Sequence, residues 1–159
     1  MERRNVSDTL ANVLTFIRLA MYYKRFETEL VVRPDDIDMN NHVHGSRYFD
    51  YALFARFDQM ERCYGMPMEE FQKHGWNWFQ KEFHIEYKRA LNIGERIVVR
   101  TWLMSFEKSD VKVGFQILRK ENLKVSAEGH FISTMINIQT GRVETIPDWV
   151  IERYTQFTE

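Results

Sequence analysis

The feature that most restricts the fold is a block of strand-like segments joined by very short turns in the second half of the chain. β-Branched and aromatic residues dominate four segments, which are residues 76–88, 96–106, 111–120 and 124–139. Turn-forming residues separate them, among them Gly94, Asp110 and Asn122. Because connections this short join neighbouring strands that run in opposite directions, the sequence predicts an antiparallel sheet.

Helical patterns precede this block. A short strand over residues 27–33 ends at Pro34, and a long helix is predicted over residues 46–64, followed by a short one over residues 67–74. The apolar residues of the long helix recur at helical spacing and are Phe49, Ala52, Leu53, Phe57, Met60 and Tyr64. A further helix is predicted near residues 149–154. The fold class is therefore α+β, with an antiparallel sheet able to wrap one long helix.

The first 26 residues are expected to form an amphipathic helical extension, and residues 27–159 a single domain. Apolar residues recur at helical spacing from Val6 to Met21. The apolar stretch is shorter than the roughly 20 residues needed to span a bilayer, and Asn12 and Arg18 interrupt it. We expect this helix to pack on protein, with contact to a membrane surface as the alternative.

Charge and cysteine content exclude several classes of protein. The chain has 22 Lys and Arg against 23 Asp and Glu, so its net charge of −1 gives no reason to expect a nucleic-acid partner. Cys63 is the only cysteine, which excludes an intrachain disulfide and a cysteine-based zinc site. We interpret Cys63 as a small core residue. No oxidising compartment is required, and a cytoplasmic protein is expected.

The densest group of reactive side chains is the loop over residues 35–45, which contains Asp, Asn and His residues and ends in Gly45. A calcium loop would match Asp36, Asp38 and Asn40, but Arg47 stands where that loop needs a glutamate, so this reading fails. Simple turn formation is a second reading, since Asp and Asn bond their own backbone. The third reading is a catalytic site.

The catalytic reading rests on the position of the loop directly before a long helix. The free N–H groups at a helix N-terminus can polarise a thioester carbonyl and stabilise an oxyanion, with Gly45 as one donor. Asp38 could act as a general base on water or as a direct nucleophile. His42 could orient water or substrate, and Asn40 could hold the carboxylate or the carbonyl. Because a thiolate leaves readily, no strong general acid is needed.

Three stretches of the sequence resemble motifs of hotdog-fold thioesterases. The stretch DIDMNNHVHGSRYFDYALFARF is similar to the signature D-x-x-G-H-V-N-N-x-x-Y. Further along, FHIEYKRALNIGERIVVRTWL and SAEGHFISTMINIQTGRVETIP resemble two later motifs of the family in the correct order. The resemblance covers residues 27–154. It implies a hotdog fold, in which the sheet wraps the long helix, and hydrolysis of an acyl-CoA or acyl-carrier-protein thioester.

The resemblance also assigns roles in the loop. Asp38 takes the position of the catalytic aspartate of 4-hydroxybenzoyl-CoA-type thioesterases, and Gly45 falls where that group offers a backbone N–H to the carbonyl. Asp38, Asn40 and His42 share the D-x-N-x-H spacing of plant acyl-carrier-protein thioesterases. Ala90 replaces the glutamate of that plant group, so the resemblance favours a mechanism with a single carboxylate.

This chain departs from the family signature within the same loop. Asn41 stands in place of the signature glycine, and His44 and Gly45 stand in place of its two asparagines, while Tyr48 matches its tyrosine. His44 could tune specificity or cap the helix. The residues expected to contact substrate outside the catalytic group are His44, Asn41, Tyr48, Lys88, Arg89 and Ser109.

The last three of these residues lie downstream. Lys88 and Arg89 could bind the phosphates of coenzyme A, or be a solvated strand end. Ser109 lies at a turn that is near the acyl group in some relatives. The resemblance implies at least a homodimer, which could pair into a tetramer, and it implies no metal or other cofactor. The alternatives are an acyl-thioester-binding module without catalysis and, with less support, an enoyl-thioester hydratase.

Overall fold

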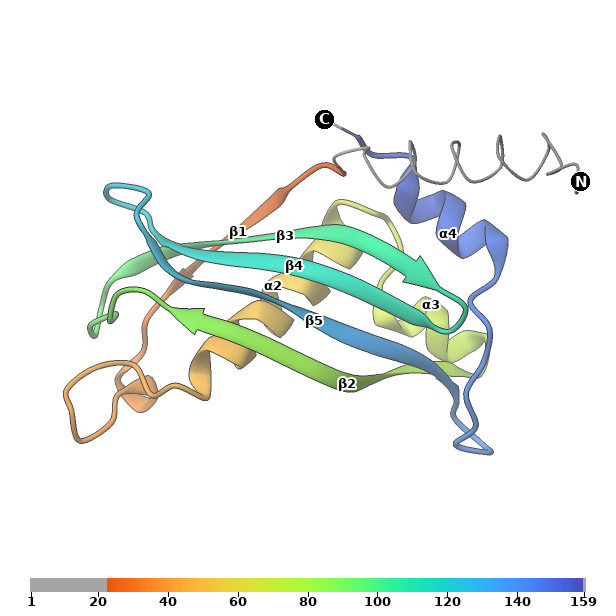
Figure 1. The fold of residues 1–159 in the computed structure, drawn as a ribbon, viewed down its shortest axis with the longest axis horizontal. Helices are drawn as coiled ribbons and strands as arrows, with labels where there is room; N and C mark the ends of the chain where they lie inside the picture. Colours follow the sequence, from red (N-terminus) through yellow and green to blue (C-terminus); the bar gives the residue numbers. More distant parts are fainter. Residues whose placement is uncertain (1–22, 159) are drawn as a thin grey trace, which may run out of the picture.

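The structure is a computed structural model that describes residues 23–158 (Figure 1). Its elements are, in chain order, β1 (Phe26–Val31), η1 (Pro34–Asp36), α2 (Arg47–Arg62), α3 (Met68–Lys73), β2 (Trp76–Tyr87), β3 (Arg96–Glu107), β4 (Asp110–Arg119), β5 (Val125–Asn137) and α4 (Asp148–Thr155). The helical extension predicted over residues 1–26 falls outside the described residues up to residue 22. Apart from the 3₁₀ helix η1, each of these elements was predicted from the sequence.

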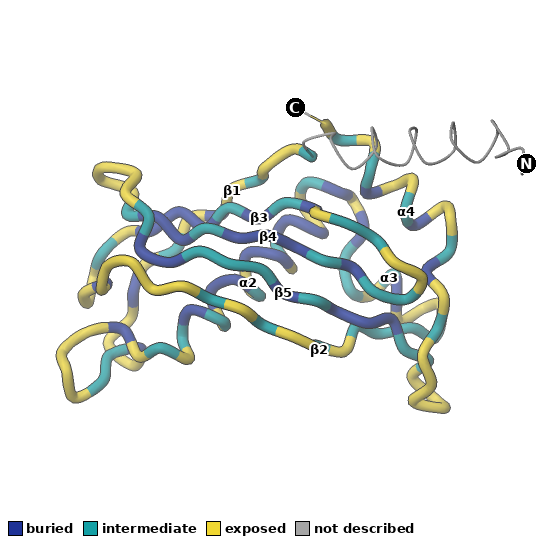
Figure 2. The backbone as a smooth tube through the Cα atoms, in the orientation of Figure 1, coloured by how far each residue is buried: buried dark blue, intermediate teal, exposed yellow. Residues whose placement is uncertain are grey.

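The five strands form one antiparallel sheet in the order β1-β3-β4-β5-β2. β3, β4 and β5 are joined by short turns and occupy the centre, while β1 and β2 are the two edges. The sheet curves around α2, which lies against one of its faces (Figure 1). Figure 2 shows that burial is densest along the central strands and α2 and lowest along β2 and the loops. This confirms the predicted α+β fold with a wrapped central helix.

The buried face of α2 includes the predicted Ala52 and Met60, but it is turned away from the predicted Leu53 and Phe57. Tyr48, Tyr51 and Gln59 are buried, whereas Phe57 keeps 44% of its surface exposed and Leu53 is only half-buried. The apolar spacing predicted that Phe57 would be buried. It could not show that the polar side chain of Gln59 has hydrogen-bond partners in the sheet and is buried instead. The outward turn leaves Phe57 near the edge strand β2, whose residue Trp78 lines the same pocket.

Gln59 is the polar residue that fixes α2 against the sheet. The side chain is fully buried, and its Oε1 accepts a hydrogen bond of 2.5 Å from the Thr101 hydroxyl on β3. Its Nε2 donates to the Thr28 hydroxyl on β1 at 3.0 Å and to the Val99 carbonyl at 3.3 Å. Such a satisfied network holds one helix position and rotation, because any other placement would leave these buried groups unpaired.

We expect Gln59→Leu to lower the free energy of unfolding by about 1–3 kcal/mol, because the hydroxyls of Thr101 and Thr28 lose their buried partner. Denaturant titration followed by circular dichroism measures this change. Gln72→Leu, at an exposed position on α3, is the matched control and should change the free energy by less than about 0.5 kcal/mol. Equal effects of the two substitutions would contradict the proposed role of Gln59.

Candidate functional site

The loop between η1 and α2 is held in shape by its own backbone. Ile37 and Val43 form an isolated antiparallel bridge, and within it the Asp38 N–H donates to the His42 carbonyl at 3.0 Å. The Asn41 N–H closes a tight turn by donating to the Asp38 carbonyl at 3.0 Å. The loop is therefore a small hairpin that carries the predicted site residues at its tip.

Asn41 explains one departure from the family signature. Its φ of 64° lies in the left-handed region, which glycine adopts freely and asparagine tolerates better than most other residues. The signature glycine and Asn41 can thus serve the same backbone turn. Asn41, Asn40 and His42 are all exposed in the protomer.

Asp38 is half-buried, and one of its two carboxylate oxygens is already bound. Oδ1 accepts a hydrogen bond of 2.8 Å from the Asn40 backbone N–H, which fixes the carboxylate over the turn. Within residues 23–158, Oδ2 has no hydrogen-bond partner. The arrangement therefore leaves one carboxylate oxygen available to a ligand.

The residues between the loop and α2 leave one backbone donor free. The His44 ring Nδ1 accepts from the Ser46 N–H at 3.2 Å and contacts the Ser46 hydroxyl at 2.8 Å, and the His44 carbonyl accepts from the Arg47 N–H. The His44 ring is therefore bonded to Ser46, the residue directly before α2. The Gly45 N–H has no acceptor in the described part of the chain. A donor at this point lies where the helix dipole favours negative charge.

Tyr87 ties the end of β2 to the same place. Its hydroxyl donates to the Gly45 carbonyl at 2.9 Å, and a side chain at position 45 would meet that hydroxyl at 3.2 Å. Tyr48 packs edge-on against the Tyr87 ring at 5.1 Å between ring centroids. Tyr48 itself is buried, and this burial raises the pKa of its hydroxyl. The structure thus places Tyr48 beneath the loop rather than on its surface.

Asp36 is a residue of this region that the sequence analysis named only for the rejected calcium loop. It is almost fully buried, and its Oδ2 accepts from the Tyr51 hydroxyl at 2.7 Å and from the Arg33 N–H at 3.0 Å. The Asp36 carbonyl accepts from the His44 N–H at 2.9 Å. Asp36 therefore holds both ends of the loop in place and anchors them to α2. The acidic run in the sequence gave no sign of which aspartate is buried.

Electrostatics show that Asp36 is held as a carboxylate. Burial alone would raise its pKa, but the hydrogen bonds from Tyr51 and Arg33 and the positive charge of Arg33 outweigh burial and lower it. The pKa of Tyr51 is raised by its burial and by the hydrogen bond to Asp36. Arg47 Nε adds a further cation 3.7 Å from Asp36 Oδ1.

The downstream candidates fall into two groups. Lys88 and Arg89 directly follow Tyr87, so they lie beside the loop. The Lys88 ammonium pairs with Glu86 at 2.6 Å, and Arg89 donates to the Val125 carbonyl at 3.0 Å. Ser109 lies in the β3–β4 turn, at the opposite end of the sheet from the loop (Figure 1). A single protomer therefore does not bring Ser109 and Asp38 together.

Other reactive side chains give weaker candidates. Cys63 is half-buried, and burial raises the pKa of its thiol, which disfavours the nucleophilic thiolate. His84 and His130 stack across β2 and β5 at 5.3 Å between ring centroids. Between residues 23 and 158, no three His, Cys, Asp or Glu side chains are grouped as metal ligands. No helix in that range is long and apolar enough to cross a membrane.

We expect Asp36→Asn to lower the free energy of unfolding by about 1–3 kcal/mol at pH 7, because it removes a buried, hydrogen-bonded carboxylate. The folded-state pKa of Asp36 is lower than its unfolded-state pKa of about 3.9, so the ionised carboxylate stabilises the fold above that pH. This stabilisation is lost as the pH falls through the folded-state pKa. The difference between variant and wild type should therefore shrink below about pH 4. Denaturant titrations across pH measure it, with the exposed neighbour Asp35→Asn as control. A pH-independent difference would contradict this assignment.

Solved structures share the fold. A candidate oleoyl thioesterase from Lactobacillus plantarum has 18% identity and a TM-score of 0.77, over 83% of this chain and 51% of that one, so this chain spans about half its length. The DHNA-CoA thioesterase of Staphylococcus aureus has 19% identity and a TM-score of 0.76, over 83% and 89%. The protein SAV2348 of Staphylococcus aureus, solved in complex with CoA, has 18% identity and a TM-score of 0.74, over 87% and 89%. These TM-scores show a common fold, the hotdog fold.

Sequence comparison identifies the family of the chain as well as its fold. No match is found among curated proteins. The sequence profile of the thioesterase-like superfamily, however, matches residues 32–154, which include the loop, α2 and the whole sheet except the edge strand β1. By this match the chain belongs to the thioesterase-like superfamily.

Proposed function

We propose that the protein hydrolyses acyl thioesters, with acyl-CoA as the first substrate class to test and acyl-carrier protein as the second. The observation that carries the proposal is that one loop holds both a free hydrogen-bond acceptor and a free hydrogen-bond donor. Asp38 Oδ2 and the Gly45 N–H both lack partners in residues 23–158, although their neighbours in the loop are bound. Superfamily membership and a structural neighbour solved with CoA support this substrate class.

In the proposed reaction the thioester carbonyl oxygen accepts a hydrogen bond from the Gly45 N–H at the start of α2. Negative charge that develops on this oxygen is stabilised by the donor and by the helix dipole. Asp38 then takes a proton from water as the water oxygen bonds to the carbonyl carbon. The carbon–sulfur bond breaks, and the thiolate leaves and takes up a proton from solvent. Direct attack by Asp38, followed by hydrolysis of the anhydride, is the other route.

The neighbouring residues have supporting roles in this proposal. Asn40 orients the Asp38 carboxylate through its N–H, and the exposed His42 ring is available to position water or substrate. Asn41 and His44 shape the mouth of the site through the turn and the bond to Ser46. In this proposal Lys88 and Arg89, which directly follow Tyr87, exchange their present partners for CoA phosphates near Gly45. Tyr48 acts from below, as packing under the loop.

We expect Asp38→Asn to lower kcat for thiol release from acyl-CoA at least about tenfold, because the amide can neither accept the proton nor attack the carbonyl. The assay follows free thiol over a panel of acyl-CoAs. Asp35→Asn, an exposed aspartate of the same acidic run, is the matched control and should keep full turnover. Unchanged turnover in Asp38→Asn would remove Asp38 from the mechanism. Acyl-CoA binding by the wild type without thiol release would favour a non-catalytic binding module.

We further propose that the working form is at least a homodimer built on the edge strand β2. In the protomer the outer edge of β2 pairs with no other strand of residues 23–158. The exposed Phe57 lies beside that edge, and the site loop is open to solvent. Antiparallel pairing of two β2 strands would bring the Asp38 loop of one protomer to the β3–β4 turn of the other. Ser109 of the partner subunit would then approach the site from across the interface.

We expect sedimentation equilibrium to give the wild type a mass of at least twice the 19.3 kDa chain. Phe57→Asp should shift the protein toward the monomer, because a carboxylate would be buried in the interface without a partner. Leu123→Asp changes another exposed apolar residue, at the β4–β5 turn, and should leave the mass unchanged. A monomeric wild type with full activity would overturn the dimer proposal.

A further inference from the structure

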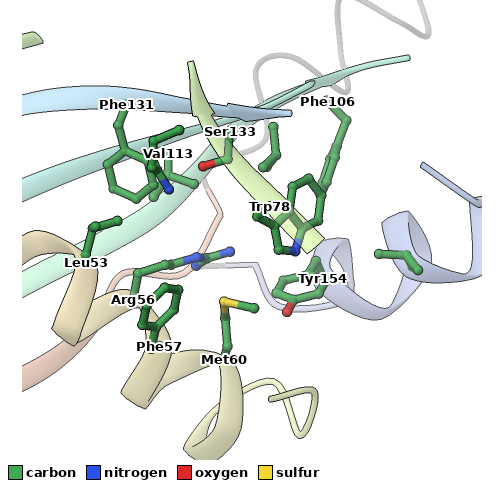
Figure 3. Close-up of a pocket in the computed structure, with 13 residues that line it drawn as sticks. Leu53, Arg56, Phe57, Met60, Trp78, Phe106, Val113, Phe131, Ser133 and Tyr154 are labelled. Carbon is green, nitrogen blue, oxygen red and sulfur yellow. The ribbon is translucent and has the colours of Figure 1, made fainter. Parts of the chain in front are cut away.

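A second feature of the molecule is a small cavity between α2 and the β2 side of the sheet (Figure 3). Its volume is about 30 Å³, enough for one or two water molecules. The walls are mostly apolar and include Leu53, Phe57, Met60, Trp78 and Phe106. The outer side is formed by the exposed Phe57 and by partly exposed residues of β2, so the cavity lies along the edge strand. The residues of the Asp38 loop do not line it.

A buried cation points into this cavity. Arg56 comes from the middle of α2, keeps only 6% of its surface exposed, and extends toward Trp78 and Tyr154 (Figure 3). The guanidinium lies 4.9 Å from the Tyr64 ring centroid and 5.4 Å from that of Tyr154, which gives partial cation–π stabilisation. Its Nη1 has no hydrogen-bond partner, and no carboxylate of residues 23–158 lies within ion-pair distance.

Two further polar groups meet Arg56 in the same place. Gln80, on β2, lines the cavity with a buried Oε1 that has no partner in the described chain. The side-chain amide can turn to present its NH₂ group instead, since either orientation fits the same shape. The Ser133 hydroxyl from β5 also lines the cavity and can donate. The cavity thus gathers a fixed positive charge and two groups able to donate hydrogen bonds within apolar walls.

Leaving a guanidinium buried without an anion is costly, since it stays charged and loses its hydration. The missing partner that would satisfy it is a carboxylate, which can accept two parallel hydrogen bonds from the guanidinium fork. Apolar walls around such an anchor suit a hydrocarbon chain that ends in the carboxylate. Neither a simple alkyl end nor an aromatic ring without an acceptor would pair with Nη1.

We propose that this cavity receives the terminal carboxylate of an acyl chain and that Arg56 selects thioesters whose acyl chain ends in that group. The inference rests on the proposed thioesterase function and names its substrate class, the half-thioesters of dicarboxylic acids. The ten residues of helix from Ser46 to Arg56 rise about 15 Å, so within one protomer a chain rather than a short acyl group spans the distance. Arg56 binds the substrate and takes no part in breaking the carbon–sulfur bond.

The test compares kcat/KM for pairs of acyl-CoAs of equal chain length, one ending in a methyl group and one in a carboxylate. We expect the wild type to prefer the carboxylate-ended member at the chain length that reaches the cavity. Arg56→Met should lower that preference by about tenfold or more, since a buried charge-assisted hydrogen bond is lost, while methyl-ended substrates are still hydrolysed. Arg56→Lys keeps the charge but not the fork, and should retain part of the preference.

Controls separate selectivity from folding. Replacing a buried charge by an apolar residue is often neutral or stabilising, and thermal denaturation checks this for Arg56→Met. Arg153→Met, which changes an exposed arginine on α4, should leave the preference unchanged.

Free acetate tests for a simple anion site. If acetate stabilises the wild type but not Arg56→Met, and no substrate preference is found, the acyl-end assignment is overturned. Hydrolysis without preference, or a preference that survives Arg56→Met, would overturn it while the proposed function stands. Absence of thiol release from every pair would instead remove the proposed function.

Discussion

Everything in this molecule depends on how helix α2 is fixed inside the curved sheet. Near its C-terminal end Gln59 bonds the hydroxyls of Thr101 and Thr28, which belong to different strands. Near its N-terminal end Tyr51 bonds the buried carboxylate of Asp36. These contacts are directional, so they set the rotation and height of the helix more strictly than apolar packing alone can. The loop that precedes α2 inherits this rigidity, and only a rigid loop can hold a carboxylate and a backbone donor at a constant separation.

The same frame accounts for what a single protomer leaves unfinished. The sheet curves around α2, but its edge strand β2 pairs on one side with no strand of residues 23–158, and Phe57 is exposed beside that edge. The Asp38 loop stands open near one end of β2, and Ser109 lies near the other. If two β2 edges were related by a two-fold axis, the Asp38 loop of each protomer would lie near Ser109 of the other protomer. In the proposed symmetric dimer one interface would therefore complete two sites, which a monomer would leave open.

Much of the fold could be predicted from the sequence because it depends on local sequence patterns. Short turns around Gly94 and Asn122 dictate antiparallel neighbours, and the helix lengths follow from apolar spacing. The loop was found because its side chains are concentrated there, and the Asn41 substitution has a local reason in its positive φ. What could not be predicted depends on contacts between distant segments. The burial of Asp36, the inward turn of Gln59 and the exposure of Phe57 follow from positions of β1, β3 and β2 relative to α2.

Two polar residues of the interior, Gln59 and Arg56, differ in whether their polar atoms have hydrogen-bond partners. Gln59 and Arg56 lie three positions apart on the buried side of α2, and both are more costly to bury than any apolar residue of the same shape. Both polar atoms of the Gln59 amide have partners within the sheet, whereas Arg56 faces a cavity and its Nη1 has no partner in the described part of the chain. A core built only for stability would treat the two positions alike. The difference supports the proposal that Gln59 serves the fold and Arg56 a ligand, so that one face of α2 would carry both scaffold and recognition.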